Sequence, residues 1–348
     1  MRPSTNGSIG SGERCRMTWF ERLTGCAEES PAQVRAELEI DGRHLRSRRT
    51  GRSWLHGELE TPTLAALRER AANAIRPSRA LTVREVVGNV QHLHTDARNA
   101  DALFQVASQF NLLEMVSPRV TPEHGVGIYE DDPTQGPACA IAAGAGTIFR
   151  NYFAPVNGSI GQSADNQIDC LRDIGTLLGN TDQRLWRMVN GYVLPSANGL
   201  REIRQAITSL DDEGRDRLRA ALRIGLHTNT QVTLGGSEHV VSQAYCSALP
   251  VAYTDHPSRQ WESFATLVLE ASYEATICAA IDNARRTGNR TVFLTLVGGG
   301  AFGNEESWIV TALRRALSLY RDSGLDVAIV SYGRSQPCVR DLATVYPS

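Results

Sequence analysis

Two adjacent carboxylates could serve as a general base or orient a water molecule. Asp131 and Asp132 lie in residues 130–137, which read Glu-Asp-Asp-Pro-Thr-Gln-Gly-Pro and place Pro137 at the expected first position of a helix over 138–150. The positive end of a helix favours an ionised carboxylate, whereas the closeness of the two acids opposes ionisation of both. The pair therefore has the chemistry of a catalytic base. The alternative is that one acid caps the helix while the other is solvated.

A glycine-rich loop near the end of the chain could hold an anion. Residues 292–297 form a short apolar run typical of a buried strand, and apolar residues over 308–320 recur at the spacing of an amphipathic helix. Between them, residues 298–304 contain four glycines and end at Asn304, which is expected to cap the helix. A strand, glycines and a helix N-terminus in this order present backbone N–H groups to a phosphate, although the same order also describes a tight turn.

Two well-known phosphate loops do not match this segment. A P-loop ends in Gly-Lys-Ser or Gly-Lys-Thr, which the segment lacks. A dinucleotide-binding fingerprint opens the first βαβ unit, whereas this loop precedes the last expected strand, 325–332. The loop therefore predicts a phosphate site of another kind.

Several other side chains could take part in chemistry. His92 and His94 stand two residues apart without nearby acid or cysteine partners, so we interpret them as solvent-exposed or packing residues rather than metal ligands. Cys246 and His239 could form a thiol nucleophile and its base, but Cys246 lies in an apolar strand and is expected in the core. The residues that could replace the acidic pair as a base are Asp96, Glu114, Glu123 and His124.

Composition narrows the class of protein. The 348 residues are 41% hydrophobic, and 36 basic against 38 acidic residues give a net charge of −2, so no nucleic-acid or membrane partner is expected. No apolar run approaches the roughly 18 residues of a membrane helix. Seven scattered cysteines without a C-x-x-C pair indicate neither a disulfide framework nor a zinc site. We expect a soluble, cytoplasmic protein, and a secreted effector is also compatible with the sequence.

The first 80 residues predict a tail and a small module. Residues 1–16 are rich in Ser, Gly, Thr and Arg and are expected to be disordered. Residues 17–80 predict a small α+β unit, with a hairpin turn at Asp41-Gly42 and a helix over 65–75. Its basic side chains are interpreted as a solvated face rather than a phosphate site: Arg43, Arg46, Arg48, Arg49 and Arg52.

Residues 81–348 predict the main domain. Strands alternate with helices, which favours an α/β fold with a mixed or largely parallel sheet flanked by helices. Ligands bind such sheets at the carboxyl ends of the strands, where residues 109–137 and 298–304 would both lie. The expected strands are 81–90, 103–108, 230–234 and 240–249, with a turn and strand pair over 185–194. The expected helices are 165–179, one or two surface helices over 199–222, and 261–285.

Several short motifs of this domain resemble the macrodomain and poly(ADP-ribose) glycohydrolase superfamily, which binds ADP-ribose. Gly-Asn-Val-Gln at 88–91 resembles the family's Gly-Asp-Ile-Thr, whose acid reads the adenine, and Ala-Ser-Gln-Phe-Asn at 107–111 resembles Asn-Ala-Ala-Asn, which touches the proximal ribose. Gln-Gly-Pro at 135–137 stands where the family's first glycine loop enters a helix, and 240–248 resembles the following central strand. Gly-Gly-Gly-Ala-Phe-Gly at 298–303 resembles the second phosphate loop.

The resemblance covers roughly residues 81–333 and has two departures. Asn89 stands where the family has the adenine-reading acid, which leaves a hydrogen-bond partner without a charge. The glycohydrolase motif Gly-Gly-Gly followed by Gln-Glu-Glu is missing, so its catalytic glutamate cannot be transferred to this chain. The run over 131–137 is instead similar to that of divergent bacterial ADP-ribosylhydrolases of this fold.

The resemblance implies an ADP-ribosylhydrolase that removes ADP-ribose from a modified protein, with a non-catalytic ADP-ribose reader as the alternative. Asp131 and Asp132 are then the catalytic acids, and Phe302 is the aromatic residue beside the distal part of the ligand. The expected partner is ADP-ribose or an ADP-ribosylated protein, and no cofactor or metal is expected. The ligand-binding residues implied are Asn89, Gln109, Asn111, Gln135, Gly136, Gly298, Gly299, Gly300, Ala301, Phe302, Gly303 and Asn304.

Overall fold

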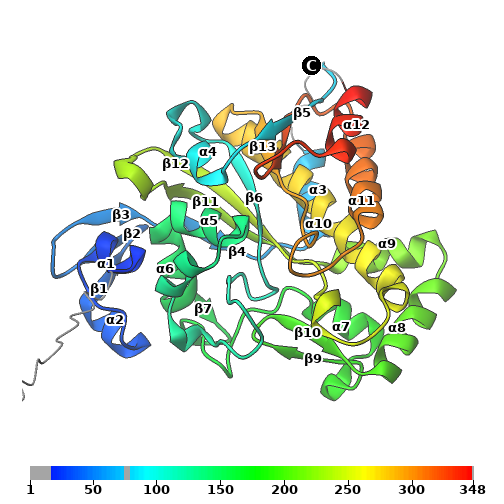
Figure 1. Cartoon of the computed structure of the whole chain (residues 1–348), viewed down its shortest axis with the longest axis horizontal. Coiled ribbons are helices and arrows are strands. Elements are labelled where there is room, and N and C mark those ends of the chain that lie inside the picture. The colour runs from blue at the N-terminus through cyan, green and yellow to red at the C-terminus, as the bar shows by residue number, and fades with distance from the viewer. Residues whose placement is uncertain (1–16, 74–78, 347–348) are drawn as a thin grey trace, which may run out of the picture.

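A seven-stranded mixed sheet forms the centre of the molecule. The computed structural model describes residues 17–73 and 79–346 (Figure 1). The last five strands in the order below run parallel, and the first two are antiparallel to their neighbours. The predicted α/β class with a mixed sheet is confirmed. The order across the sheet is β4 (Glu58–Glu60), β11 (Gly225–Gln231), β12 (Val240–Cys246), β6 (Leu103–Ala107), β13 (Thr291–Leu294), β14 (Asp326–Ser331) and β5 (Thr82–Val87).

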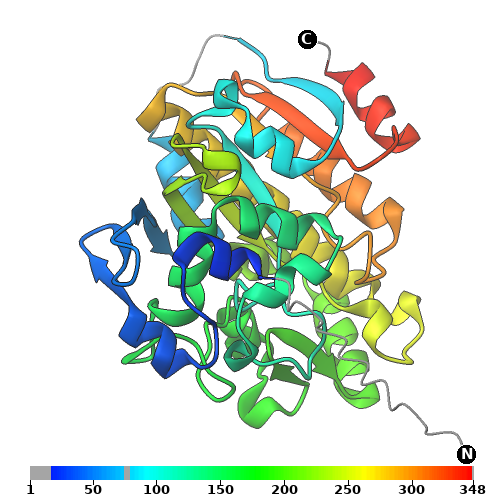
Figure 2. The same cartoon turned by 60° about the vertical axis from the view of Figure 1, so that its left-hand side comes forward.

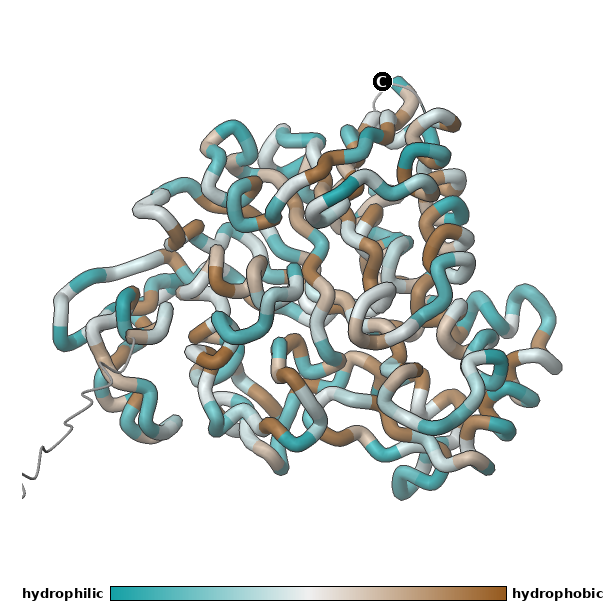
Figure 3. The backbone as a smooth tube through the Cα atoms, in the orientation of Figure 1, coloured by the Kyte–Doolittle hydropathy of each residue, from teal (hydrophilic) through white to brown (hydrophobic). Residues whose placement is uncertain are grey.

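Side-chain alternation along β6 shows how both faces of the sheet are covered. Phe104 faces α4, where its ring stacks on His94 with centroids 3.8 Å apart. Gln105 faces the opposite side, where its Nε2 donates to Thr276 Oγ1 of α10 at 2.9 Å. Strands covered on both faces are apolar along most of their length, as β6 is, and the brown segments in the middle of Figure 3 show this hydrophobic centre.

Helices form a layer on each face. One layer contains α3 (Leu64–Ala72), α10 (Ser258–Thr287) and α11 (Glu306–Leu319), and α8 (Ala197–Ser209) and α9 (Asp212–Ala221) pack outside α10. The opposite layer contains α4 (Val90–Thr95), α5 (Gln135–Ala142) and α6 (Gly144–Tyr152). The helix α12 (Pro337–Val345) packs beside β5, and α7 (Arg172–Leu178) packs against α9. Short hairpins are formed by β7 (Pro155–Val156) with β8 (Ser159–Ile160) and by β9 (Trp186–Val189) with β10 (Tyr192–Pro195).

Among the described residues, α10 is one helix that is long and apolar enough to cross a membrane by length and composition. The most apolar window of this helix has a mean hydropathy of 1.4, and 83% of that window is buried inside the protein. The sequence did not show it as one apolar run because Glu270 and Glu274 interrupt it. Glu274 is buried and accepts from Arg68 and Arg315 at 2.6 Å each. The position of α10 against the sheet accounts for its apolar surface.

Local packing changes two predicted helices. The helix predicted over 138–150 is two helices, because Ala143 has non-helical backbone angles. The break is held from outside, since the N–H of Gly144 donates to Thr233 Oγ1 at 3.0 Å and a Cβ on Gly144 would lie 2.6 Å from the Trp19 ring. Within 165–179 only α7 is helical, and it ends at Gly179 in the left-handed conformation, as the glycine predicted.

The N-terminal module shares a second hydrophobic cluster with part of the main domain. It contains α1 (Trp19–Thr24), α2 (Pro31–Glu37) and a three-stranded sheet of β1 (Leu38–Asp41), β2 (His44–Ser47) and β3 (Ser53–Leu55). Its buried side chains, Phe20 and Val34 among them, belong to one cluster with residues of α6 such as Ile148. Figure 2 shows the module, in blue, beside the green part of the chain. The predicted turn at Asp41-Gly42 joins β1 and β2.

The module ends earlier than the predicted residue 80. The strand β4 joins the main sheet, and Leu64, Leu67 and Ala71 of α3 lie in the main core, so packing changes between β3 and β4. The predicted disordered tail, 1–16, lies outside the described residues. The basic side chains form exposed ion pairs, among them Arg43 with Glu58 at 2.7 Å and Arg48 with Glu39 at 2.9 Å, which agrees with a solvated face.

Candidate functional site

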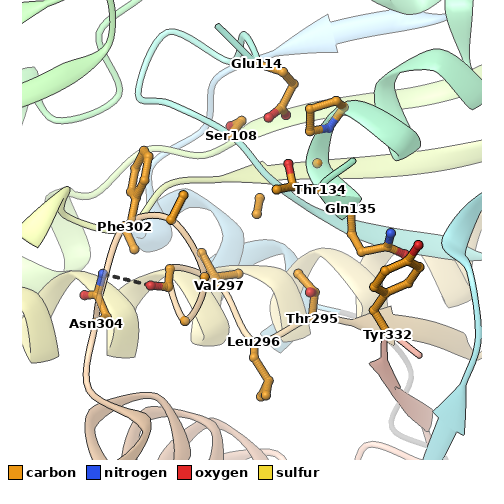
Figure 4. A pocket seen from close by; sticks show the side chains of 18 of the residues that line it. Ser108, Glu114, Thr134, Gln135, Thr295, Leu296, Val297, Phe302, Asn304 and Tyr332 are labelled. Carbon is orange, nitrogen blue, oxygen red and sulfur yellow. Dashed lines mark hydrogen bonds between the residues drawn. The ribbon is translucent and has the colours of Figure 1, made fainter. Parts of the chain in front are cut away.

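A cavity of about 500 Å³ opens at the carboxyl ends of β6, β13 and β14 (Figure 4). Four segments supply most of its wall: the chain after β6, the entry of α5, the loop between β13 and α11, and the end of β14. This is the edge where parallel strands bind ligands, and the volume lies in the usual range for small-molecule sites. The predicted meeting of residues 109–137 and 298–304 therefore occurs.

Asn304 holds the glycine loop closed. Its Nδ2 donates to Leu249 O at 2.8 Å and to Gly298 O at 3.3 Å, and its backbone N–H also donates to Gly298 O at 3.0 Å (Figure 4). The predicted role of Asn304 as helix cap is wrong, because Glu305 is the N-cap and α11 begins at Glu306. Gly303 has a φ of +69° and lies against Ala252, outside the cavity wall.

The loop leaves several backbone donors free. Within the part of the chain that the structure describes, the N–H groups of Gly300, Ala301 and Phe302 donate no hydrogen bond. A Cβ on Gly300 would meet nothing within 4 Å, so a ligand can approach this part of the backbone. Adjacent free N–H groups are suited to an anion. The helix end contributes less than predicted, since the carboxylates of Glu305 and Glu306 already complement the dipole of α11.

The entry of α5 forms the opposite wall. The helix begins at Gln135 with Thr134 as its N-cap, two residues before the predicted Pro137. Gln135 lines the cavity, and its Oε1 accepts from the N–H of Val90 at 3.0 Å. Gly136 is needed for space, because a Cβ there would collide with Ala107 O and lie 2.6 Å from Glu114 Oε2.

The structure separates the predicted acidic pair. Asp132 lines the cavity, and its Oδ1 accepts from the N–H of Thr134 at 2.8 Å, which fixes the turn into α5. Asp131 is exposed and is not part of the cavity wall, although it is the next residue in the chain. Only one of the two predicted catalytic acids therefore faces the space where a ligand could bind.

Glu114 supplies a second carboxyl to the cavity. Its side chain is 4% exposed and lines the wall, and its Oε1 has no hydrogen-bond partner among the described residues. Burial raises the pKa of this carboxyl well above its ordinary value, and the Arg150 guanidinium opposes that rise. Glu114 was one of the alternative bases, and its sequence signal is a lone acid between Leu113 and Met115.

Arg150 is a buried cation that the sequence did not single out. Its side chain lies in α6, where it was expected as an ordinary helical residue, yet it is 1% exposed. The guanidinium lies 3.8 Å from the centre of the Tyr245 ring, and Nη2 donates to Thr147 Oγ1 at 2.9 Å. Nη1 donates to His227 Nδ1 at 3.1 Å. These contacts fix a positive charge behind Glu114.

Two further predicted ligand-binding residues, besides Gly303, lie outside the cavity wall. Asn89 caps α4, and its side chain accepts from the N–H of Gln91 at 2.8 Å. Asn111 is buried, where Oδ1 accepts from Leu113 N at 3.1 Å and Nδ2 donates to Gln167 at 2.9 Å. The predicted residues that do line the cavity are Gln109, Gln135, Gly136, Gly298, Gly299, Gly300, Ala301, Phe302 and Asn304.

Phe302 belongs to an aromatic wall. Its ring centre lies 5.4 Å from that of Tyr192 and 5.5 Å from that of Tyr253, and all three residues line the cavity. Phe302 also packs against the main core. The expected aromatic surface beside a ligand is thus present, while the contact with a ligand stays a prediction.

The remaining candidates have structural partners away from the cavity. Asp96 pairs with Arg98, Glu123 accepts from the N–H of Ala164 at 2.8 Å, and His124 contacts Thr121. None of these three residues lines the cavity described above.

The alternative thiol nucleophile also lies in the core. Cys246 is buried, its Sγ lies 3.3 Å from Thr276 Oγ1, and burial raises the pKa of the thiol to about 11. The proposed base, His239, contacts His94 O at 2.8 Å instead. Both observations agree with the packing interpretation of Cys246.

The chain has an α/β fold with a cavity whose wall combines the glycine loop, aromatic rings and two carboxyl residues. No protein-family model and no curated protein matches the chain. Among solved structures, the chain is similar to poly(ADP-ribose) glycohydrolase from Thermomonospora curvata, with 12% identity, a TM-score of 0.44, and coverage of 90% of this chain and 96% of that one. It is also similar to the Deinococcus radiodurans enzyme in complex with ADP-ribose, with 10% identity, a TM-score of 0.44, and coverage of 81% and 89%.

At such identities the likeness assigns no individual residue of the cavity.

Proposed function

We propose that the protein is an ADP-ribosylhydrolase that removes ADP-ribose from a modified protein. One observation carries the proposal: Gly300, Ala301 and Phe302, whose N–H groups donate no hydrogen bond among the described residues, line the same cavity as Glu114 and Asp132. The loop suits the diphosphate of ADP-ribose, and the aromatic wall around Phe302 suits a ring of the ligand.

The two carboxyl groups can divide the work of hydrolysis. Burial raises the pKa of the Glu114 carboxyl, which favours its acid form, and this acid can donate its proton to the leaving atom of the acceptor side chain as the bond to the anomeric carbon breaks. Asp132, joined to the turn before α5, can take a proton from the water that attacks the same carbon. The products are free ADP-ribose and the unmodified acceptor, and the negative charge of the Asp132 carboxylate can help to stabilise an oxocarbenium-like transition state.

Release of ADP-ribose tests the proposal. The substrates are proteins that carry a single ADP-ribose on arginine, glutamate or serine, and free ADP-ribose binding is measured in parallel by calorimetry. We expect binding together with release from at least one linkage. Tight binding without release from any linkage would instead identify a reader, and the lack of both would reject the ligand.

A further inference from the structure

A carboxylate of the N-terminal module reaches into the segment that leads to Asp132. Glu28, between α1 and α2, accepts from the N–H of Val126 at 2.9 Å through Oε1 and from the N–H of Gly127 at 2.6 Å through Oε2. The hydroxyl of Tyr152 in α6 donates to the same Oε1 at 2.8 Å. Three donors therefore fix one side chain between two parts of the fold.

Glycine makes this approach possible. A Cβ on Gly125 would lie 2.6 Å from Glu28 Cδ, and a Cβ on Gly127 would lie 2.7 Å from Glu28 Oε2. Any other side chain at either position would push the carboxylate away from the two N–H groups. The sequence around residues 125–127 is thus fitted to a carboxylate at position 28.

The module holds the same segment at two further points. The indole Nε1 of Trp19 donates to Val126 O at 2.8 Å, and the backbone N–H of Trp19 donates to Glu130 Oε2 at 3.0 Å. Arg22 forms an ion pair with that same oxygen at 2.7 Å. Both the beginning and the end of residues 126–130 are consequently tied to α1.

This held segment contacts both carboxyl residues of the cavity. Residues Gly127–Asp131 form a short 3-10 helix, and Asp132 follows it directly. Tyr129, buried in the middle of this helix, accepts from the backbone N–H of Glu114 through its hydroxyl at 3.0 Å. A displacement of the helix would move Asp132 through the chain and Glu114 through Tyr129.

We propose that Glu28 is a positioning residue that sets the relative placement of Glu114 and Asp132, so that the N-terminal module is a working part of the cavity. The inference rests on the proposed function. Apolar packing around Phe20 and Val34 already attaches the module to α6. Burial of the Glu28 carboxylate costs desolvation free energy, so a role in strengthening this attachment does not explain it. Glu28 instead fixes the position of residues 126–127, because its carboxylate accepts hydrogen bonds from both of their backbone N–H groups.

The test replaces Glu28 by its neutral isostere. Glu28→Gln puts an NH₂ group against one of the two N–H donors, so residues 126–131 should shift or loosen. We expect kcat for ADP-ribose release to fall about 10-fold or more, since small misplacements of reacting groups are costly, while KM and the affinity for free ADP-ribose stay within about twofold. Hydrogen exchange should accelerate at residues 113–115 and 126–132 and stay unchanged in β6 and β13.

A matched variant controls for effects on the module as a whole. Glu37→Gln removes a carboxylate of α2 that pairs with the exposed Arg49 at 3.0 Å, and it should keep the parent kcat and exchange. Parent-like kcat and exchange in Glu28→Gln would overturn the proposal. So would an equal loss of ligand affinity and kcat with faster exchange throughout the protein, because this pattern describes general destabilisation.

The two proposals can fail separately. If the parent releases no ADP-ribose, the proposed hydrolase function fails, and the exchange measurement still decides the positioning role. Acceleration confined to residues 113–115 and 126–132 in Glu28→Gln then supports positioning by Glu28, and unchanged exchange overturns it.

Discussion

The Glu114 side chain is buried, and its Oε1 has no hydrogen-bond partner among the described residues. Such a carboxyl lowers the stability of the fold, but it is also suited to proton transfer. A carboxyl without a partner for Oε1 is destabilising in a well-packed wall unless it stays protonated. The neighbouring Arg150 guanidinium limits the rise of the Glu114 pKa. Such a balance between burial and a nearby charge is typical of residues tuned for proton transfer.

Glu114→Gln should therefore stabilise the protein at neutral and alkaline pH. Folding raises the pKa of Glu114. The contribution of this carboxyl to the free energy of unfolding is therefore fully present below its unfolded-state pKa and is lost as pH rises through its folded-state pKa. Glutamine removes this loss and should raise Tm at pH 8 by about 2 °C or more, with the difference vanishing near pH 4. Thermal melts of the parent, Glu114→Gln and the exposed control Glu238→Gln measure it. A lower Tm of Glu114→Gln at pH 8 would contradict it.

Residue types alone predicted the cavity only in part. The carboxylate of Asp132 and the glycines at 298–300 were found because their chemistry is visible in the sequence. Asn89 and Asn111 were assigned to ligand binding, yet their amides are satisfied by nearby backbone and side-chain partners. Such partners depend on the folded geometry, so a polar side chain near a motif does not by itself indicate that it faces a ligand.

At the scale of elements, the loop between β13 and α11 should tolerate substitutions that block the cavity. Gly300 has open space at its Cβ position and no left-handed backbone, so Gly300→Gln and Gly300→Glu should fold with the Tm of the parent. Each should weaken ADP-ribose binding, with Glu worse because its charge repels the diphosphate, and we expect a loss of about 10-fold or more.

The small variant Gly300→Ala is the matched control for this loop. Its methyl group leaves most of the cavity open, so its affinity should stay near that of the parent. Calorimetry with ADP-ribose distinguishes the variants. Parent-like affinity of both long side chains would show that no ligand lies against this loop.

Helix and strand positions followed from periodicity, whereas their ends followed from contacts. The apolar runs at β6 and β13 and the stripe of α11 were predicted from spacing. The break between α5 and α6 was not, because it depends on Trp19 and Thr233, which are far away in the sequence. The same kind of distant contact places Glu28 against residues 126–127.

The buried, neutral side chain of His94 should lower the free energy of unfolding of the whole molecule on mild acidification. Burial lowers the pKa of His94 to about 4, and its ring contacts Val90 O at 2.8 Å and Gln243 Nε2 at 3.2 Å. The unfolded chain takes up the proton near the ordinary value of 6.5, so this stability is present above 6.5 and is lost as pH falls towards 4. The loss from His94 is about 3 kcal/mol.

Denaturant unfolding at pH 7, 5.5 and 4 measures this effect. His94→Gln should be less stable than the parent at pH 7 and should approach it at pH 4, while the exposed control His44→Gln should follow the parent at every pH. A constant difference between His94→Gln and the parent across this range would contradict the neutral, buried histidine.

The fold class and the order of the helices and strands along the chain could be predicted from the sequence. Alternating strands and helices predicted the α/β domain, and glycines and turn residues predicted several boundaries. The extent of the N-terminal module could not be predicted, because the strand β4 and the helix α3 belong to the main sheet through pairing and packing with residues more than a hundred positions away.

The proposed hydrolysis requires Glu114 and Asp132 to act together in one cavity. ADP-ribose release by variants that keep the shape of these side chains and remove their charge measures this requirement directly. Glu114→Gln and Asp132→Asn should each lower kcat by about 10²-fold or more while binding free ADP-ribose nearly as the parent does. Asp131→Asn, the exposed neighbour, should keep the parent kcat. Full activity of both cavity variants, or a loss confined to Asp131→Asn, would contradict the claim.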